Sequence, residues 1–237
     1  MRERMPGSCS VYAGVRHARR VLIAASVALA AAGSPAAAGA PAKGAKDVRT
    51  PISLPAPRSF AEAVAAVEKA TGAKGAAIET EGDPVPVEKG RSFEVPSRTA
   101  ERLLAGSHAR FLKAGFYLFR HERAFGVAGE KDRIGLVNTA DRGEVIRLMG
   151  TGGSRKAAVT ADQIVAWLEG LAKEERFELT EIGTDYVFGR FERTPKDPAA
   201  VARRCAEFAP DLVAGRASTL DLLAEEIRAN RTLYLIW

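Results

Sequence analysis

The chain has 237 residues, of which 46% are hydrophobic and 27% are charged, and its formal net charge is +6. This is ordinary globular composition with enough apolar residues for a real core. The first 40 residues hold five Arg and one Glu, which leaves 30 basic and 28 acidic residues, a net charge of +2, in the rest. A nucleic-acid partner therefore loses its electrostatic support, and we expect none.

The N-terminus has the layout of a secretory signal peptide. Three arginines precede an apolar run over residues 21–32, and small residues follow as far as Ala40. A charged region, an apolar core and small-residue cleavage positions are the parts of such a signal. We therefore expect a signal peptide over residues 1–40, cleaved between Ala36 and Ala40, and a mature protein in the periplasm or outside the cell.

Two alternatives for this leader stay open. Residues 21–40 are almost uncharged, so an uncleaved leader would anchor the protein in the inner membrane, although the apolar run is shorter than the ~20 residues that span a bilayer. Arg19-Arg20 before the apolar run also weakly matches a twin-arginine signal, which exports folded proteins. After cleavage by either route we expect no stable membrane span.

Cysteine and histidine are scarce in the mature chain. Cys9 lies in the leader, so Cys205 has no internal partner for a disulfide, and its apolar helical surroundings predict a small buried side chain. His108 and His121 are the only mature histidines, and together with one Cys they form no zinc-ligand spacing. We therefore predict no metal site and no cofactor.

Residues 41–57 are rich in Pro, Ala and Lys, which predicts a flexible tether ahead of a domain over residues 58–237. Caps, breakers and hydrophobic periodicity predict the elements of the first half of this domain. In chain order they are a helix that Ser59 caps and Gly72 ends, a strand over 76–80, a loop to Gly90, a helix over 97–113, a strand over 116–120 and a hairpin that joins 124–128 to 133–138.

The same signals continue through the second half of the domain. They predict a helix over 141–149, a helix opened by Thr160, strands over 177–182 and 186–192, a helix opened by Pro198, a loop around Pro210-Asp211, a helix from Ser218 or Thr219 to Ala229 and a last strand over 233–237. Strands and helices alternate without a regular βαβ period. We therefore predict an α+β fold with a mixed or mostly antiparallel sheet and helices packed on it.

Several weak motifs follow one another in a recognisable order. They are Thr151-Gly152-Gly153, Trp167-Leu168, Gly183-Thr184-Asp185, Pro210-Asp211 and the closing Leu233-Tyr234-Leu235-Ile236-Trp237. Over residues 111–237 this succession resembles a bacterial family, domain of unknown function 4253. The resemblance implies a scaffold and no established biochemical role.

The chain departs from that family pattern at three polar or reactive positions. The family has Thr-Asn-Gly, Cys-Pro-Asp and Trp-Trp-Asp where this chain has Thr151-Gly152-Gly153, Ala209-Pro210-Asp211 and a terminal Ile236-Trp237. The pattern's Cys and last Asp are not matched by this sequence, so we do not expect it to share chemistry that depends on them, while we expect the scaffold to be kept.

Five residues are candidates for a binding site, namely Asp141, Thr151, Asp185, Asp211 and Trp237. Each also has a structural interpretation: the aspartates cap helices or turns, Thr151 belongs to a Gly-rich connection without phosphate-loop spacing, and Trp237 packs at the rim of the core. No nucleophile, base and orienting group can be assembled from the sequence, so no catalytic residue is named. We expect a binding or interaction module for a protein or small-molecule ligand. The alternative is a small hydrolase or transferase that uses these carboxylates with His121.

Overall fold

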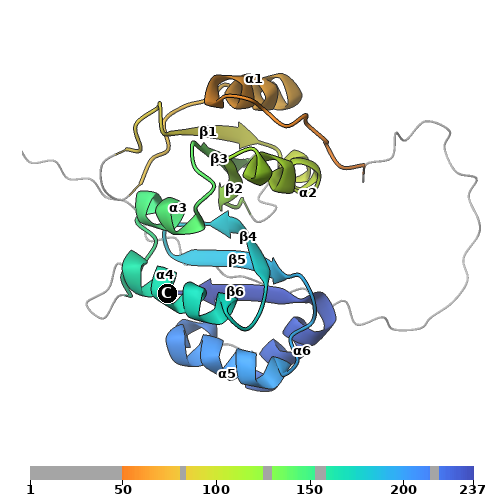
Figure 1. The fold of residues 1–237 in the computed structure, drawn as a ribbon, viewed down its shortest axis with the longest axis vertical. Helices are drawn as coiled ribbons and strands as arrows, with labels where there is room; N and C mark the ends of the chain where they lie inside the picture. The colour runs from red at the N-terminus through yellow and green to blue at the C-terminus, as the bar shows by residue number, and fades with distance from the viewer. Residues whose placement is uncertain (1–49, 81–83, 125–129, 153–158, 214–218) are drawn as a thin grey trace, which may run out of the picture. The chain divides into compact units, whose positions relative to one another are not determined.

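A six-stranded mixed β-sheet with helices on both faces runs through the described part of the chain (Figure 1). The computed structural model describes residues 50–80, 84–124, 130–152, 159–213 and 219–237. The predicted signal peptide and residues 41–49 of the predicted tether lie outside these ranges. The architecture confirms the predicted α+β class with a mixed sheet.

The strand order places the second strand of the chain at the centre of the sheet. The strands are β1 (Gly90–Val95), β2 (Tyr117–Glu122), β3 (Asp132–Val137), β4 (Phe177–Ile182), β5 (Tyr186–Phe191) and β6 (Thr232–Ile236). Their order is β1-β3-β2-β4-β5-β6. All neighbours are antiparallel except β2 and β4, which are parallel and share one register pair, Arg120 with Glu181.

The helices begin and end where local signals placed them. They are α1 (Phe60–Thr71), α2 (Ser97–Lys113), α3 (Arg142–Met149), α4 (Ala161–Ala172), α5 (Pro198–Phe208) and α6 (Leu220–Asn230), with a short 3₁₀ turn, η1, over Pro210–Leu212. The side chains of Ser59, Asp141 and Thr160 accept hydrogen bonds from backbone N–H groups in the first turns of α1, α3 and α4. Gly72 and Gly150 end α1 and α3 in the left-handed conformation that glycine adopts without strain.

Alternation along β2 assigns the helices to the two faces of the sheet. Leu118 belongs to the hydrophobic cluster that contains residues of α1 and α2, whereas Tyr117 and Phe119 belong to the cluster that contains residues of α3 to α6. Successive side chains of a strand point to opposite faces. The layer of α1 and α2 therefore covers one face, here called the α2 face, and α3 to α6 cover the other.

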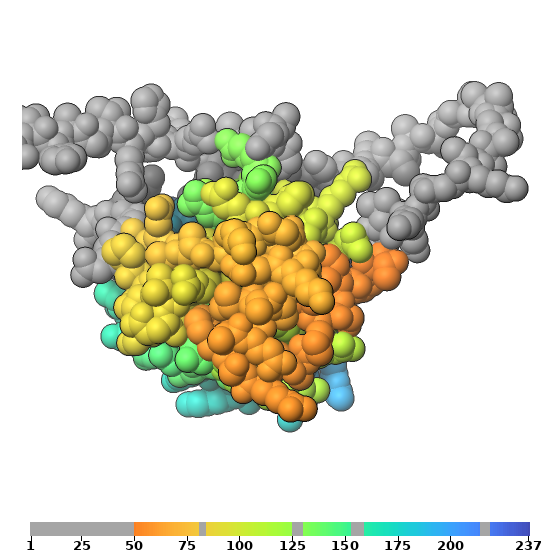
Figure 2. All heavy atoms as spheres, turned by 90° about the horizontal axis from the view of Figure 1, so that it is seen from above, coloured from red at the N-terminus to blue at the C-terminus, as the bar shows by residue number. Residues whose placement is uncertain are grey.

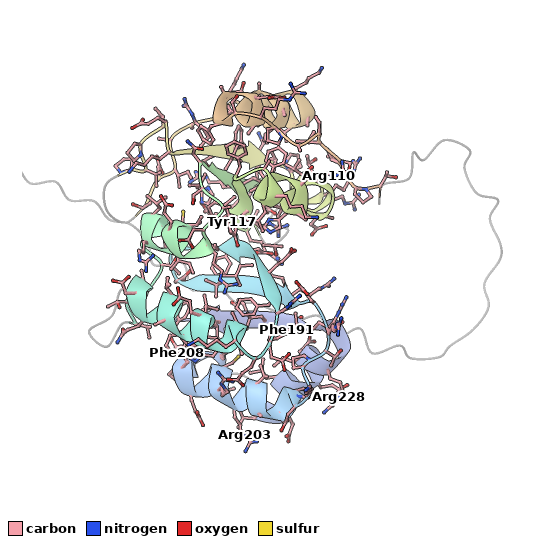
Figure 3. The ribbon with its side chains drawn as sticks, viewed as in Figure 1. Arg110, Tyr117, Phe191, Arg203, Phe208 and Arg228 are labelled. Carbon is pink, nitrogen blue, oxygen red and sulfur yellow. The ribbon has the colours of Figure 1, made fainter. Side chains whose placement is uncertain are left out.

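The layer on the α2 face covers only part of the sheet. Within the described residues, its cluster draws on β1, β2 and β3 and includes no residue of β4, β5 or β6. Arg203 and Arg228 lie on the outer side of α5 and α6 (Figure 3), two helices whose buried side chains belong to the other cluster. The half of the α2 face formed by β4, β5 and β6 thus has no helix packed across it in the described structure; it is called the open half below.

Three predictions about strands were wrong. Residues 76–80 form no strand but two isolated bridges, Ala76 with Ser92 and Ile78 with Val85. The sequence analysis missed β1, which pairs with β3. The partner of β3 in its hairpin is β2 and not 124–128; Ala124 lies outside any strand, and residues 125–128 are outside the described residues.

The start of the domain lies earlier than predicted. Residues 50–57, which the composition assigned to the flexible tether, lie against α2, where Ile52 N donates to Arg102 O at 2.9 Å. Ser107 Oγ donates to Ile52 O at 2.7 Å and accepts from Leu54 N at 3.0 Å. This segment and α1, in orange, occupy much of the surface seen from above (Figure 2). Arg102 and Arg110 also donate to Thr50 O and Leu54 O, and Ile52 and Leu54 pack against the hydrophobic cluster of the α2 face. Composition missed the segment because the groups that hold it belong to α2.

The C-terminal strand is an integral part of the sheet, but only one of its faces is fully buried although its sequence is an apolar run. β6 pairs with β5 alone among the described strands. Leu233 and Leu235 are fully buried against the α3 to α6 layer, whereas Thr232, Tyr234 and Ile236 are half-buried on the open half. The strand therefore alternates like a half-exposed one despite its apolar sequence.

Candidate functional site

A cleft of about 490 Å³ lies between α2 and the open half of the sheet. Along β5, Val187 and Phe191 point into the core, so Phe188 and Arg190 point to the opposite face and line the cleft. The wall from α2 includes Leu104, Ala105, His108 and Ala109, and β2 contributes Arg120. The cleft therefore combines an apolar floor with several charged side chains.

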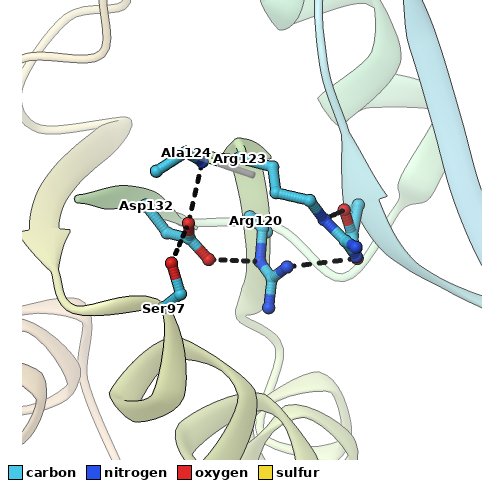
Figure 4. A network of polar contacts seen from close by, with 6 residues as sticks. Ser97, Arg120, Arg123, Ala124 and Asp132 are labelled. Atoms are coloured by element: carbon cyan, nitrogen blue, oxygen red, sulfur yellow. Dashed lines mark hydrogen bonds and ion pairs between the residues drawn. The ribbon is translucent and has the colours of Figure 1, made fainter. Parts of the chain in front are cut away.

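A buried ion network includes three residues of the cleft lining, Arg120, Arg123 and Glu181 (Figure 4). Arg120 is 3% exposed; its Nε lies 3.2 Å from Asp132 Oδ2 and its Nη1 3.7 Å from Glu181 Oε1. Neither Arg120 Nε nor Asp132 Oδ2 has a hydrogen bond of good geometry, so their contact is an ion pair without an aligned bond. Asp132 Oδ1 accepts from Ser97 Oγ at 2.7 Å and from Ala124 N at 2.9 Å. The buried carboxylates of Asp132 and Glu181 are stabilised because each forms an ion pair with an arginine, and Asp132 also accepts two hydrogen bonds.

Arg123 completes the network and connects it to the aromatic floor. Its guanidinium donates to Glu181 through two nitrogens, one of them Nε at 3.2 Å from Oε2. The same group lies over the Phe188 ring, 5.7 Å from its centroid, which is within the range of a cation–π contact. Phe188 in turn contacts Tyr234 of β6 at 6.2 Å between ring centroids. Charged and aromatic side chains thus share one surface.

His108 lines the cleft, and one of its ring nitrogens has no hydrogen-bond partner among the described residues. It is 3% exposed, and its Nδ1 lies 2.6 Å from Leu118 O. A carbonyl oxygen only accepts, so Nδ1 carries the proton and Nε2 of the neutral ring carries a lone pair. Nε2 is buried and has no hydrogen-bond partner among the described residues. Buried polar atoms are normally paired, so this nitrogen marks a position where a ligand atom would be stabilised.

A second cleft, of about 450 Å³, contains the other histidine. His121 Nε2 lies 2.8 Å from Ser92 Oγ, and both residues are buried. Burial first, and then the nearby Arg133 guanidinium, lower the pKa of His121 from 6.5 to about 4. The ring is therefore neutral at physiological pH and pairs with the serine hydroxyl.

Two of the predicted site residues lie outside the cleft lining. Asp141 is exposed and caps α3, its Oδ1 accepting from Gly143 N at 2.8 Å. Asp211 is exposed on η1. Asp141 thus has the capping role of its structural interpretation, whereas Asp211 lies in the turn after α5.

The other predicted residues meet at the turn that joins β4 to β5. Thr151 is fully buried, and its Oγ1 donates to Gly183 O at 2.8 Å, while Gly152 N donates to Thr184 O at 2.8 Å. From the other side, Trp237 N donates to Asp185 O at 2.9 Å. Three motifs that are far apart in the sequence therefore converge through backbone contacts on one turn.

Residues 133–237 match the model of the family described as domain of unknown function, DUF4253. The match confirms the family seen in the sequence motifs and begins inside β3. Neither a curated protein nor a solved structure matches the chain. The DUF4253 region contributes β4, β5 and β6 to the cleft, whereas α2, Arg120 and Arg123 precede it. The cleft is therefore built partly from residues outside the matched region.

The DUF4253 motifs also bring three aromatic rings together. Trp167 stacks on Phe208 with ring centroids 4.9 Å apart, and Phe208 meets Trp237 edge-on at 6.0 Å. All three rings are partly buried against the core, and Trp237 Nε1 has no hydrogen-bond partner among the described residues. This arrangement supports the packing interpretation of Trp237 and anchors the chain end to α4 and α5.

No metal centre or membrane helix is found in the described part of the chain. No three His, Cys, Asp or Glu side chains there lie close enough to hold an ion. None of the helices built from described residues has both the length and the apolarity to cross a bilayer. Cys205 is buried on α5 as predicted, and burial raises the pKa of its thiol to about 12.

Sequence reasoning missed Arg120, the buried cation of the cleft. Its signal was present, because Arg120 directly follows the apolar run Phe116-Tyr117-Leu118-Phe119. An arginine that is buried in such a strand needs a partner for its charge. His108 had no comparable signal, since its role depends on the position of the Leu118 carbonyl across α2 and β2.

Proposed function

We propose that this domain is an exported ligand-binding module that holds a small polar ligand in the cleft between α2 and the open half of the sheet. The single observation that carries the proposal is His108, a side chain that lines the cleft and whose buried Nε2 has no hydrogen-bond partner in the described structure. A cleft of about 490 Å³ also falls within the range of small-molecule sites.

The residues that line the cleft have the composition of a ligand-binding pocket. Phe188 and Leu104 supply apolar surface, while Arg120 and His108 supply a few fixed polar groups, which is the usual make-up of a ligand pocket. Arg120 and His108 are both buried, so their positions are set before any ligand arrives. Such preorganisation lowers the entropy lost on binding.

A cleft-blocking substitution tests this proposal. The purified protein is dialysed against a mixture of amino acids, dipeptides, monosaccharides and sugar phosphates, and retained compounds are identified by mass spectrometry. Ala109→Trp adds a large ring to the cleft from an exposed position on α2, and Ala65→Trp makes the same change on α1, outside the cleft. We expect the wild type and Ala65→Trp to retain a compound that Ala109→Trp does not. Retention of nothing, or equal retention by both variants, would contradict a ligand in this cleft.

Export is part of the same proposal and rests on the Arg-flanked apolar run of the leader. N-terminal sequencing of the protein from a cell-envelope fraction tests it. We expect a mature terminus between residues 37 and 41. A cytoplasmic protein that starts at Met1 would contradict export without affecting the ligand cleft.

The Ser92–His121 pair favours one second candidate, a hydrolase or transferase that acts through an acyl-serine. Their 2.8 Å contact is that of a nucleophile and its base. Two features count against it: a pKa of about 4 makes His121 a weak base near neutrality, and Ser92 N donates to Ala76 O at 2.8 Å rather than toward an oxyanion. Labelling by a fluorophosphonate probe that Ser92→Ala abolishes would favour this enzyme.

A further inference from the structure

We infer that the ligand of the α2 cleft is a small zwitterion, an amino acid or a short peptide with one free carboxylate and one free ammonium group. This inference rests on the proposed function. It follows from the groups of the cleft that remain unengaged in the described structure and from their charges.

Arg120 supplies the group for the carboxylate. Its Nε and Nη1 face Asp132 and Glu181, which leaves Nη2 as the guanidinium nitrogen without an ion pair or hydrogen bond to another described residue (Figure 4). Arg120 lines the cleft and is 3% exposed. A guanidinium held rigid by two acids is a good partner for a carboxylate oxygen, because its orientation is fixed and water is excluded.

His108 and the rim supply groups for the ammonium. Nε2 of His108 carries a lone pair and accepts from an N–H. Glu101, Glu178 and Glu192 also line the cleft and are exposed, and we call them its rim; their carboxylates form no ion pair within the described residues. These carboxylates favour a cationic group near the rim of the cleft.

The charge balance of the lining excludes a simple anion as the preferred ligand. Four arginines and four glutamates line the cleft, and Asp132 stands behind Arg120; the arginines are Arg120, Arg123, Arg190 and Arg231, and the glutamates are Glu101, Glu178, Glu181 and Glu192. A polyanion such as a phosphate would find no net positive field here. A zwitterion meets the buried Arg120 with its carboxylate and the acidic rim with its ammonium group, and its side chain has the apolar surface of Phe188 and Leu104.

Calorimetric titrations with matched probes test this assignment. The probes are L-leucine and L-alanyl-L-leucine, together with N-acetyl-L-leucine, which lacks the ammonium, L-leucinamide, which lacks the carboxylate, and inorganic phosphate. We expect at least one zwitterion to bind, and each blocked form to bind about 10-fold or more weakly, because a charge-assisted hydrogen bond is lost. The ratio of the first two affinities distinguishes a free amino acid from a peptide.

One rim variant connects the preference to the cleft. Glu178→Gln removes an exposed carboxylate with no folded-state partner among the described residues and should weaken the zwitterion about 3-fold while leaving N-acetyl-L-leucine unchanged. Glu169→Gln on α4 is the matched control and should change neither affinity. Binding of neither zwitterion, or equal binding of a zwitterion and its blocked forms, overturns the inference. Retention of another compound class in the dialysis overturns it too, while the ligand-binding function stands.

Discussion

The two halves of the sheet differ in how their α2 face is covered. Over β1, β3 and β2 this face is buried beneath α1, α2 and residues 50–57. Over β4, β5 and β6 it holds half-buried aromatic and exposed charged side chains and a cleft. The opposite face carries apolar side chains on β2 to β6, packed with α3 to α6. Over these strands one face is therefore covered by helices, whereas the α2 face is covered over β2 and β3 and holds the cleft over β4, β5 and β6.

Buried charged side chains lie at the boundary between the two halves of the sheet. Arg120 comes from the covered half and Glu181 from the open half, and they are the one register pair between β2 and β4. Where α2 ends its coverage, polar side chains replace the apolar packing. The cleft lies at this boundary, and the buried Arg120 and Glu181 are part of its lining.

Removing β2 gives the largest expected effect and tests whether the halves are separable. A chain of residues 133–237, the matched region alone, keeps β3 and β4 but lacks the strand that lies between them. It also loses Tyr117 and Phe119 from the main core, each worth roughly 1.5–3 kcal/mol of burial against a stability of about 5–15 kcal/mol. We expect no cooperative urea transition by circular dichroism, whereas residues 50–237 should show one. A sharp transition for the shorter chain would mean that the open half folds alone.

Acid should destabilise the covered half through His121. The pKa of His121 is about 4 in the folded protein and near 6.5 in the unfolded chain. Between these two pH values the unfolded chain is protonated at His121, whereas the folded protein is not. Stability from this residue is therefore present above pH 6.5 and is lost as pH falls toward 4, by up to about 3 kcal/mol.

Urea midpoints between pH 7 and pH 5 measure this loss, with His121→Gln as the control. Glutamine keeps a hydrogen-bonding partner for Ser92 and does not titrate, so its stability should change less over this range. The buried thiol of the other core, Cys205, has a pKa of about 12 and contributes nothing in this window. Parallel pH curves for the wild type and the variant would rule out His121 as the source.

The smallest predicted effect compares one glycine on each side of the sheet. A Cβ at Gly106 of α2 would lie 2.4 Å from Ile52 O, so Gly106→Ala must displace residues 50–57. We expect a loss of about 1–3 kcal/mol, seen as a melting temperature several degrees lower. Gly170→Ala on α4 meets nothing within 4 Å and should stabilise the protein by roughly 0.5–1 kcal/mol through helix propensity. An unchanged melting temperature for Gly106→Ala would show that residues 50–57 contribute little.

The helices could be predicted from the sequence because their signals are local. Ser59, Asp141 and Thr160 each bond to backbone within three residues, and Gly72 and Gly150 end helices by their own conformation. β1 was missed because its evidence is distant: Phe93 and Val95 alternate, but their partners lie on β3. Pairing of strands depends on residues far apart, which no local pattern records.

The candidate site was harder to predict for the same reason. Thr151, Asp185 and Trp237 were selected as motif members and do meet, but through backbone groups of one turn. The cleft joins Leu104 on α2 to Phe188 on β5, and nothing in either segment indicates the other. Chemistry that depends on one buried lone pair, such as His108 Nε2, becomes visible only when the surrounding polar atoms are counted.

The parallel contact between β2 and β4 also sets the order in which this chain can fold. Tyr117 Oη donates to Leu179 O across it and links residues 62 positions apart. In the sequence, β3, α3 and α4 separate those two strands, so their pairing closes a long loop of chain. Long-range pairings pay their loop-closure entropy before they gain contacts, so we expect the joining of β4 to β2 to be the slow step. The cleft needs α2, β4 and β5 together, and a newly made chain gains its binding surface only when that step is complete.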